Sequence, residues 1–201
     1  MQLFLRYYGF MKKLRPGGRT ARNQAAVFDV AAALLTEKEP GSIAMTEIAE
    51  RAGVAVTTLY RRWHEVGSLL LEVAVDQFNR QNPLPDTGSL GGDLRVWAQK
   101  IATALRSKRG SALFKVIVAS AARGDVRDPA RVRAMEPRVK QIEAMLKRAS
   151  ERGEQAPPAS EVLDHLLAPL YFRALFGAPG DRTFAAGLVD YLLRGCHDDR
   201  L

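Results

Sequence analysis

The sequence predicts an all-α protein with a small helical head at its N-terminus and a larger helical region after it. Three observations support this fold class. Apolar residues recur at helical spacing along most of the 201 residues. Two short amphipathic helices are joined by a tight turn that carries Gly53. A loop rich in Pro and Gly, residues 83–92, separates the two helical regions.

The first helix is predicted from Ala21 to about Thr36. Its apolar residues repeat along one face at positions i, i+4, i+7 and i+8, which is the pattern of a helix packed on a core. These residues are Val27, Ala31, Leu34 and Leu35. The helix must end before Pro40, because proline pushes the preceding residue out of the α region.

The next two helices are short, at residues 45–52 and 56–63. Gly53 follows the first of them and supplies the positive φ that a helix end often requires. Val54 is expected to pack between the two helices. The residues expected on their buried faces are Ile48, Ala49, Ala52, Leu59 and Trp63. Helix pairs of this kind place their second helix in the major groove of DNA, although many similar pairs in all-α cores bind no nucleic acid.

The exposed face of the pair carries the side chains that suit DNA. Short hydrogen-bond donors at the start of the second helix suit base edges, whereas cations and a tyrosine hydroxyl suit phosphate oxygens. The predicted DNA contacts of the helix pair are Thr46, Ala55, Val56, Thr57, Thr58, Tyr60, Arg61 and Arg62.

A basic segment precedes the first helix. Residues 12–19 are too rich in Gly and charge to fold alone, and they carry Lys12, Lys13, Arg15 and Arg19. Such an arm can follow phosphates or enter the minor groove. The alternative is a solvated tail. Met11 is an alternative start to Met1.

The run from Thr46 to Trp63 resembles the signature of the TetR family of bacterial transcriptional regulators. The matching residues are Ile48-Ala49, Ala52-Gly53-Val54 and Thr58-Leu59-Tyr60. The resemblance implies an all-α homodimer with an N-terminal DNA-binding head and a C-terminal ligand-binding and dimerisation domain. Most such proteins are repressors that a small molecule releases from DNA. The chain departs from the family pattern at Ala44, at Ala55 and in the His64-Glu65-Val66 run.

The resulting division of the chain has three parts: a flexible basic arm at 1–19, a helix–turn–helix domain at 20–66, and a helical ligand-binding and dimerisation domain at 67–201. The predicted function is a DNA-binding regulator, a repressor released from a palindromic operator by a small apolar or amphipathic ligand. The alternative is a helical module for small molecules or proteins with weak or lost DNA binding, because Ala44, Ala55 and Val66 replace capping or phosphate-binding residues.

Composition narrows the function classes. The net charge of +8 favours an anionic partner. Cys196 is the single cysteine, which excludes a disulfide within the chain and suits the cytoplasm. The sequence contains no run of 18 apolar residues, so no membrane span is predicted. His64, His165 and His197 lack metal-site spacing, and no catalytic motif stands out, so neither an enzyme nor a cofactor or metal is expected.

Six further helices are predicted in the larger region. Their expected ranges are 68–82, 93–108, 111–122, 129–153, 160–176 and 183–193. The third of these is almost wholly apolar and is expected to be a buried central helix. Pro137 suggests a break in the fourth, and Pro169 a kink in the fifth.

The last two helices are apolar on more than one side, which favours an isologous four-helix interface with a second copy. The candidate interface residues are Leu163, Leu167, Leu170, Leu188, Tyr191 and Leu192. The candidate residues of an apolar ligand pocket are Trp97, Ile101, Phe114, Ile117, Val118, Met135, Met145, Leu166 and Phe172. For each pocket residue a place in the plain core is the alternative. His165 is a candidate polar anchor in the pocket or an interface histidine.

Overall fold

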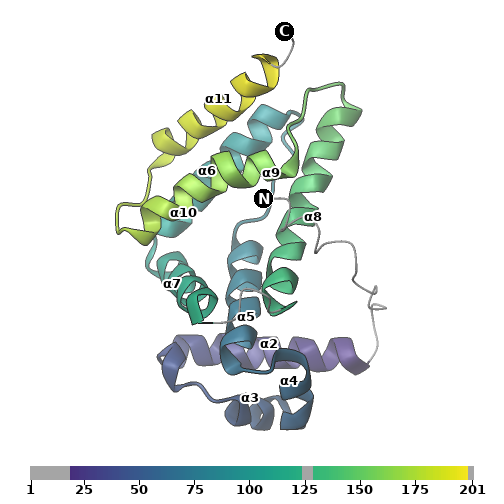
Figure 1. Cartoon of the computed structure of the whole chain (residues 1–201), viewed down its shortest axis with the longest axis vertical. Helices are drawn as coiled ribbons and strands as arrows, with labels where there is room; N and C mark the ends of the chain where they lie inside the picture. Colours follow the sequence, from purple (N-terminus) through teal and green to yellow (C-terminus); the bar gives the residue numbers. More distant parts are fainter. Residues whose placement is uncertain (1–18, 124–128, 199–201) are drawn as a thin grey trace. The chain divides into compact units, whose positions relative to one another are not determined.

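The computed structural model describes residues 19–123 and 129–198, and every regular element in these ranges is helical (Figure 1). The chain forms two compact units. The first holds the described residues up to 77 together with 116–123 and 129–136, and the second holds 78–115 and the described residues from 137 onward. None of the helices in the described ranges combines the length and the apolar character that a membrane crossing needs.

The first unit contains the predicted head. Its elements are α2 (Arg19–Glu37), η2 (Pro40–Ser42), α3 (Met45–Ala52), α4 (Val56–Trp63), the first part of α5 (Val66–Gln81), the end of α7 (Lys108–Arg123) and the start of α8 (Pro129–Glu151). Helix α2 packs against α3, and α3 packs against α4. The predicted core residues Val27, Ala31, Leu34, Ile48 and Leu59 are all almost fully buried.

The C-terminal end of α2 confirms the prediction that this helix stops before Pro40. The helix stops at Glu37, and Pro40 begins a 3-10 turn. The first unit is larger than the predicted head, because Leu71 and Val75 of α5 pack against Ala134 of α8, with Ile117 and Ala121 of α7 beside them. The packing of the first unit does not define where the DNA-binding domain begins and ends, so the predicted boundaries at residues 19 and 66 stay predictions.

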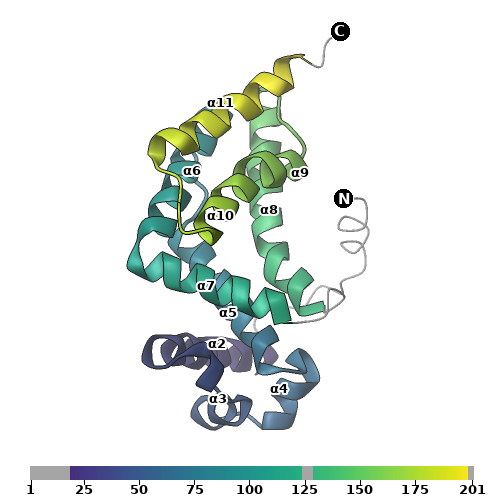
Figure 2. The ribbon, with the colours of Figure 1, turned by 60° about the vertical axis from the view of Figure 1, so that its left-hand side comes forward.

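The second unit is a helical bundle. Its elements are the end of α5, α6 (Leu90–Arg106), the start of α7, the rest of α8, α9 (Ala159–Val162), the π-helical turn η3 (Leu163–Leu167), α10 (Ala168–Leu175) and α11 (Arg182–Asp198). Helices α6 and α11 lie side by side, as Figures 1 and 2 both show. The buried residues at its centre include Leu94, Trp97, Ile101, Met145 and Leu170.

Helix α6 begins earlier than the sequence predicts. Residues 90–92 were expected in a loop because two of them are glycines, but they form the first turn of the helix. Ser89 is the N-cap, and its hydroxyl oxygen accepts a hydrogen bond from the Gly92 amide at 3.2 Å. A serine cap satisfies one of the free N–H groups of the first turn, and here it outweighs the low helix propensity of glycine.

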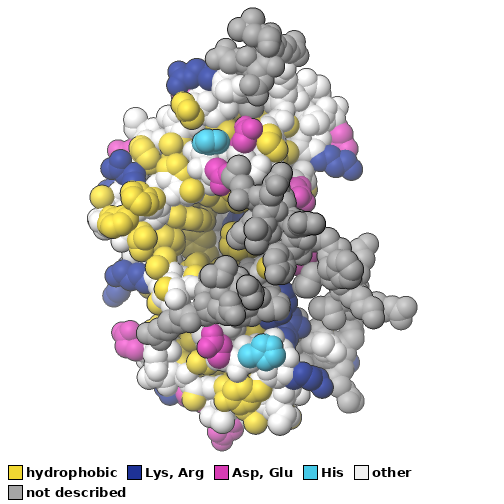
Figure 3. All heavy atoms as spheres, viewed as in Figure 1, with side chains coloured by type: hydrophobic (Ala, Val, Ile, Leu, Met, Phe, Trp, Pro, Cys, Tyr) yellow, Lys and Arg dark blue, Asp and Glu magenta, His cyan; other side chains and the backbone are white. Residues whose placement is uncertain are grey.

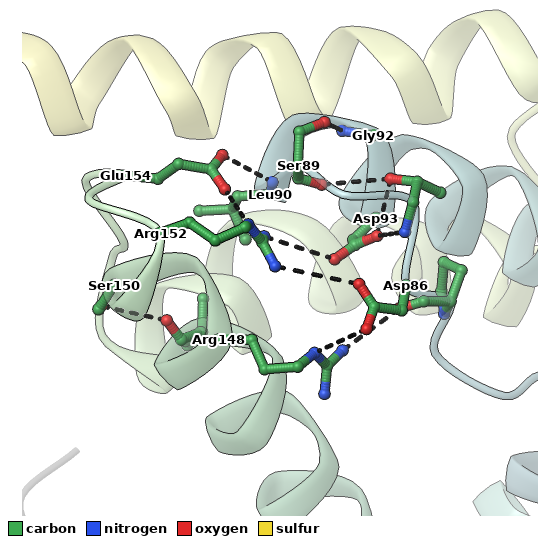
Figure 4. Close-up of polar contacts among 12 residues, drawn as sticks. Asp86, Ser89, Leu90, Gly92, Asp93, Arg148, Ser150, Arg152 and Glu154 are labelled. Atoms are coloured by element: carbon green, nitrogen blue, oxygen red, sulfur yellow. Dashed lines mark hydrogen bonds and ion pairs between the residues drawn. The ribbon is translucent and has the colours of Figure 1, made fainter.

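A polar network ties this helix start to the end of α8 (Figure 4). Glu154 accepts a hydrogen bond from the Leu90 amide at 2.8 Å and another from Arg152 at 2.8 Å. The hydrogen bond from Leu90 is the main cause that lowers the pKa of Glu154. Asp93 accepts hydrogen bonds from the amide and hydroxyl groups of Thr87. The loop before α6 is therefore held by charge-assisted hydrogen bonds, which are stronger than neutral ones.

Two predictions about proline need correction. Helix α8 runs through Pro137 without a break. Near Pro169 the predicted kink takes the form of a change in helix type. The π-helical turn η3 comes directly before the short helix α10, in whose first turn Pro169 lies. A proline ring clashes with the carbonyl group four residues earlier, and a wider turn avoids that clash.

Helix α7 is not the buried central helix that its apolar sequence predicts. Phe114 and Val116 are buried, but Ala112, Lys115 and Ala119 are exposed, and Ile117 and Val118 are half-buried. Small alanines give an apolar composition without giving enough apolar surface to require cover on every side.

The candidate pocket residues divide between the two units. Trp97, Ile101, Phe114, Met145 and Leu166 are buried in the second unit, whereas Ile117, Val118 and Met135 are half-buried in the first. The prediction for Phe172 is wrong, because this side chain is 63% exposed and lines no interior. His165 is also exposed, with its ring 6.3 Å from that of Tyr191, so it is no interior anchor.

The candidate dimer residues also divide. Leu167, Leu170 and Leu192 are buried within the chain's own core, so they cannot form an interface with a second copy. Leu163 and Leu188 are half-buried, and Tyr191 is 63% exposed. The exposed large hydrophobic residues of this region are instead Phe172, Leu175, Phe176 and Tyr191. Hydrophobic side chains gather on the face of Figure 3 where α10 lies.

Candidate DNA interface

The turn between α3 and α4 has the geometry that its sequence predicts. Gly53 adopts φ 67° and ψ 32°, which is the left-handed conformation that glycine adopts without steric cost. The Gly53 amide donates to the Glu50 carbonyl at 3.2 Å, and the Val54 amide donates to that of Ala49 at 3.0 Å. These two bonds close the end of α3. Val54 is half-buried, as expected for a residue between the helices.

Neither helix of the pair has a side-chain cap. The N-cap residues are Ala44 for α3 and Ala55 for α4, and neither makes a side-chain hydrogen bond to the first turn. The departures from the family pattern at these positions thus have the predicted structural consequence. In α4 the Thr58 amide instead donates to the Ala55 carbonyl at 2.9 Å, and the amides before it are available to water or to a bound anion.

Helix α4 is fixed by its apolar face. Leu59 and Trp63 are almost fully buried, and the ring of Trp63 lies 6.3 Å from that of Phe28 on α2. The indole N–H of Trp63 donates to the Glu72 carboxylate at 2.8 Å. A buried tryptophan usually needs such an acceptor. The contacts set the rotation of α4, and therefore which side chains it exposes.

Five of the eight predicted contact residues of the helix pair are exposed, and whether they contact DNA stays a prediction. Thr46, Ala55, Thr57 and Arg61 are exposed, and Tyr60 is 47% exposed. Val56 and Thr58 are half-buried. The predicted arm residues Lys12, Lys13 and Arg15 lie outside the described residues. Arg19 is the first residue of α2, and its side chain also lies outside the description.

Arg62 differs from the prediction. Its guanidinium group lies over the Trp63 ring, 4.9 Å from the centroid, and its Nε atom is buried without a hydrogen-bond partner. Burial is the main cause that lowers the pKa of Arg62. The sequence places Arg62 beside Arg61, yet helical geometry turns consecutive residues by about 100°. Arg62 therefore packs on the protein, while Arg61 extends into solvent.

A buried charged pair lies next to the end of α4, and sequence reasoning missed it. Glu72 of α5 is 5% exposed and binds Arg133 of α8, with 2.6 Å between the Arg133 Nε atom and a carboxylate oxygen. Arg133 also donates to the backbone carbonyl of Arg62 at 3.0 Å. One signal was available, because Glu72 is the single charged residue in the apolar run 69–75, and a buried charge requires a partner.

The connection from α4 to α5 is strained. His64 has φ 53° and ψ −43°, the one positive φ of a residue other than glycine among the described residues. The Glu65 amide donates to the Trp63 carbonyl across it. These features define a classical γ-turn, which is rare because it crowds the side chain. The departure from the family pattern at His64 therefore has a conformational cost.

Two other cations of the head, Arg51 and Lys38, form ion pairs within it. Arg51 binds Glu37 at 2.8 Å and Glu47 at 3.0 Å, and Lys38 binds Glu47 at 2.7 Å. The hydrogen bond from Lys38 is the main cause that lowers the pKa of Glu47. Because these pairs are exposed, they contribute little to stability. They leave Arg61 as the long cation of α4 that projects from the helix pair. In the described ranges no cluster of side chains has the makings of a metal site.

Comparisons with known proteins agree with this geometry. Residues 27–73 match the family described as "Bacterial regulatory proteins, tetR family", and residues 84–192 match "Tetracyclin repressor-like, C-terminal domain". The HTH-type transcriptional regulator AqdR of Rhodococcus erythropolis is 32% identical over 136 residues, which cover 68% of this chain and 65% of AqdR. The chain thus spans slightly less than two thirds of AqdR. The regulator YdeS of Bacillus subtilis (strain 168) is 28% identical over 92% of this chain and 95% of YdeS.

Solved structures show the same fold. The TetR family transcription regulator SCO0332 superposes with a TM-score of 0.67 at 27% identity, covering 87% of this chain and 98% of that protein. A TetR regulator from Rhodococcus sp. RHA1 gives a TM-score of 0.62 at 22% identity, with 90% and 98% covered. With both family domains matched in order along the chain, this protein belongs to the TetR family and is a DNA-binding transcriptional regulator rather than an enzyme.

Proposed function

We propose that this regulator is a homodimeric repressor that binds a palindromic operator and leaves it when a small apolar or amphipathic molecule binds. The observation that carries this proposal is the division of α4 into two faces. Leu59 and Trp63 are buried, while Thr57, Tyr60 and Arg61 are exposed. A helix held in this way offers a fixed set of donors to a DNA groove. Because its partner is chromosomal DNA, we place the protein in the cytoplasm.

The exposed residues have separate roles in this proposal. Thr57, in the first turn of α4, contacts base edges, with Ala55 and Thr46 close to the DNA backbone. Tyr60 and Arg61 bind phosphate oxygens, since long donors reach the backbone and fix register. The arm residues Lys12, Lys13, Arg15 and Arg19 add phosphate contacts. Arg62 is left out, because its guanidinium group covers Trp63.

The dimer in this proposal uses α10 and α11. Phe172, Leu175, Phe176 and Tyr191 are between 53% and 70% exposed. Water contact with four large hydrophobic side chains is unfavourable, and a second copy that presents the same residues removes it. Leu188, which is half-buried, also lies on α11, and the half-buried Leu163 lies in η3, directly before α10. A dimer places two recognition helices on two half-sites of an operator.

Selection from random duplex DNA tests the operator. We expect enrichment of an inverted repeat, because an isologous dimer presents two equivalent helices. Titration of the enriched duplex, followed by fluorescence anisotropy, then tests the face of α4. Thr57→Ala is expected to weaken binding to this duplex and to relax its sequence preference. Thr103→Ala is the matched control, because Thr103 is an exposed threonine of α6 whose hydroxyl bonds to its own helix. Enrichment without inverted symmetry, or equal binding by both variants, would refute the proposal.

A further inference from the structure

The second unit contains a buried arginine that has no acidic partner. Arg138 of α8 is 2% exposed. None of the ion pairs in the described parts of the chain includes it. An arginine stays charged in proteins, and a buried charge without a counter-ion is costly. Burial is the main cause that lowers the pKa of Arg138. By contrast, Arg133, five residues earlier on α8, is paired with Glu72.

Part of this cost is offset by the end of α5. Arg138 donates through Nε to the Asn79 side-chain oxygen at 2.8 Å, and through its other nitrogens to the Asn82 and Asn79 carbonyls at 3.2 and 3.4 Å. Carbonyl groups at a helix C-terminus carry partial negative charge. These contacts explain the position of the side chain. They use three of its five N–H groups and supply no full negative charge.

The neighbours of Arg138 offer further unused donors. Trp97 is fully buried, its ring lies 5.2 Å from the guanidinium carbon, and its indole N–H has no acceptor. The side-chain nitrogen of Asn79 is likewise buried and without a partner. Buried donors are almost always paired in folded proteins. Trp63 shows the usual situation, since its N–H binds the Glu72 carboxylate. Around Arg138 the donors are present and the acceptor is missing.

Aromatic rings continue this cluster toward the surface. Tyr171 of α10 lies 5.3 Å from Phe114 and 6.3 Å from Phe78, measured between ring centroids. Burial of its hydroxyl group raises the pKa of Tyr171 to about 12, so the group is a neutral donor. The Tyr171 residue as a whole is only half-buried, and Phe172 beside it is exposed. The cluster therefore has one cation, several unpaired donors, aromatic walls and an exposed edge.

We propose that the effector of this regulator is a small aromatic carboxylate, whose carboxylate group binds Arg138, the Trp97 indole N–H and the Asn79 amide. Its ring system lies against Phe78, Phe114 and Tyr171. The effector class rests on the proposed function, because it assumes a ligand that acts on this unit. A carboxylate supplies the negative charge that Arg138 lacks and the acceptors that both neighbouring donors lack. A neutral molecule can supply hydrogen-bond acceptors, but it does not supply the negative charge.

Isothermal titration of the full chain with matched pairs of probes tests the proposal. The probes are benzoate, 1-naphthoate and indole-3-acetate, each compared with its primary amide. At least one carboxylate is expected to bind roughly 10- to 100-fold more tightly than its amide, as hydrogen bonds to charged groups do. Arg138→Gln is expected to abolish that preference. Because Arg138 also binds the end of α5, Trp97→Phe provides a milder variant, which keeps an aromatic ring but removes the indole N–H, and it is expected to weaken carboxylate binding several-fold.

The control variant is Arg95→Gln. Arg95 is an exposed arginine of the same unit, paired with Asp190, and its loss is expected to leave probe binding unchanged. Carboxylates that bind no better than their amides, or no binding by any probe, would overturn the proposal, as would an unchanged preference in Trp97→Phe. Binding of the ligand-free protein to its selected operator is measured separately. If that binding is present while the carboxylate preference is absent, the effector class is wrong and the repressor function stands.

Discussion

Replacement of Arg133 by methionine tests whether the buried pair behind α4 holds the recognition helix in place. The Glu72 carboxylate is 5% exposed and accepts hydrogen bonds from Arg133 and Trp63. Arg133→Met removes the cation and leaves the carboxylate with one donor. Loss of one partner of a buried pair costs about 3–5 kcal/mol. The Arg133 side chain is 20% exposed, so water can solvate part of the site, and we expect the lower end, about 3 kcal/mol.

A second contribution comes from the backbone. Arg133 also donates to the Arg62 carbonyl at 3.0 Å, and the loss of such a bond costs about 1 kcal/mol. For a chain of this size each kcal/mol lowers the melting temperature by about 2–4 °C. The two contributions total about 4 kcal/mol, so Arg133→Met is expected to melt roughly 8–16 °C below the parent protein. Operator affinity should fall with it, because Trp63 and Arg62 end the recognition helix.

A double-mutant cycle separates the pair from general damage. Glu72→Gln removes the negative charge but keeps an oxygen for the Trp63 indole N–H. Glu72→Gln combined with Arg133→Met should be more stable than Arg133→Met alone, by at least about 1 kcal/mol, since no unpaired charge remains. Lys147→Met is the control, because it removes an exposed pair with Glu151 at 3.7 Å and should shift stability by less than about 0.5 kcal/mol. If Arg133→Met melts within 1–2 °C of Lys147→Met, or if the two changes at the pair are additive, the reasoning is wrong.

Four other predictions follow from particular residues. Arg61→Gln should reduce the slope of log operator affinity against log salt by about 1, whereas Arg62→Gln should leave that slope unchanged, and equal slopes for both would contradict the assignment. Tyr191→Glu should convert a dimer to a monomer in light scattering at micromolar concentration, while Arg194→Glu, at an exposed position one turn later, should not. His64→Gly should raise the melting temperature, because positive φ costs a non-glycine residue about 1–3 kcal/mol, and an unchanged or lower value would show that the γ-turn stores no strain. The raised pKa of Tyr171 means that stability is retained below pH 10 and is lost as pH rises toward 12, and Tyr171→Phe should remove that part of the alkaline loss.

The structure of the helix–turn–helix formed by α3 and α4 could be predicted from sequence, because the residues that determine it lie close together in the chain. Helical spacing placed Leu59 and Trp63 inside, and the need for positive φ placed Gly53 at the turn. The sequence wrongly predicts a DNA contact for Arg62, because residue type alone does not distinguish a cation in solvent from one that packs on a neighbouring ring. The dimer residues Leu167, Leu170 and Leu192 were misplaced for a related reason. Apolar periodicity identifies a buried face, but it does not say whether the same chain or a second copy buries it.

Glu72 and Arg138, the two buried charged residues on which the predictions above depend, share one sequence feature: each lies within the apolar face of its helix. Glu72 lies three residues from both Leu69 and Val75, and Arg138 lies three residues after Met135 and four before Ile142. Residues at these spacings share a helix face, so both charges had to be buried. A buried charge must find a partner. Glu72 finds Arg133 and Trp63 within the chain. Arg138 finds carbonyl groups but no carboxylate within the described chain, which is why we propose that an anion from outside the chain binds it.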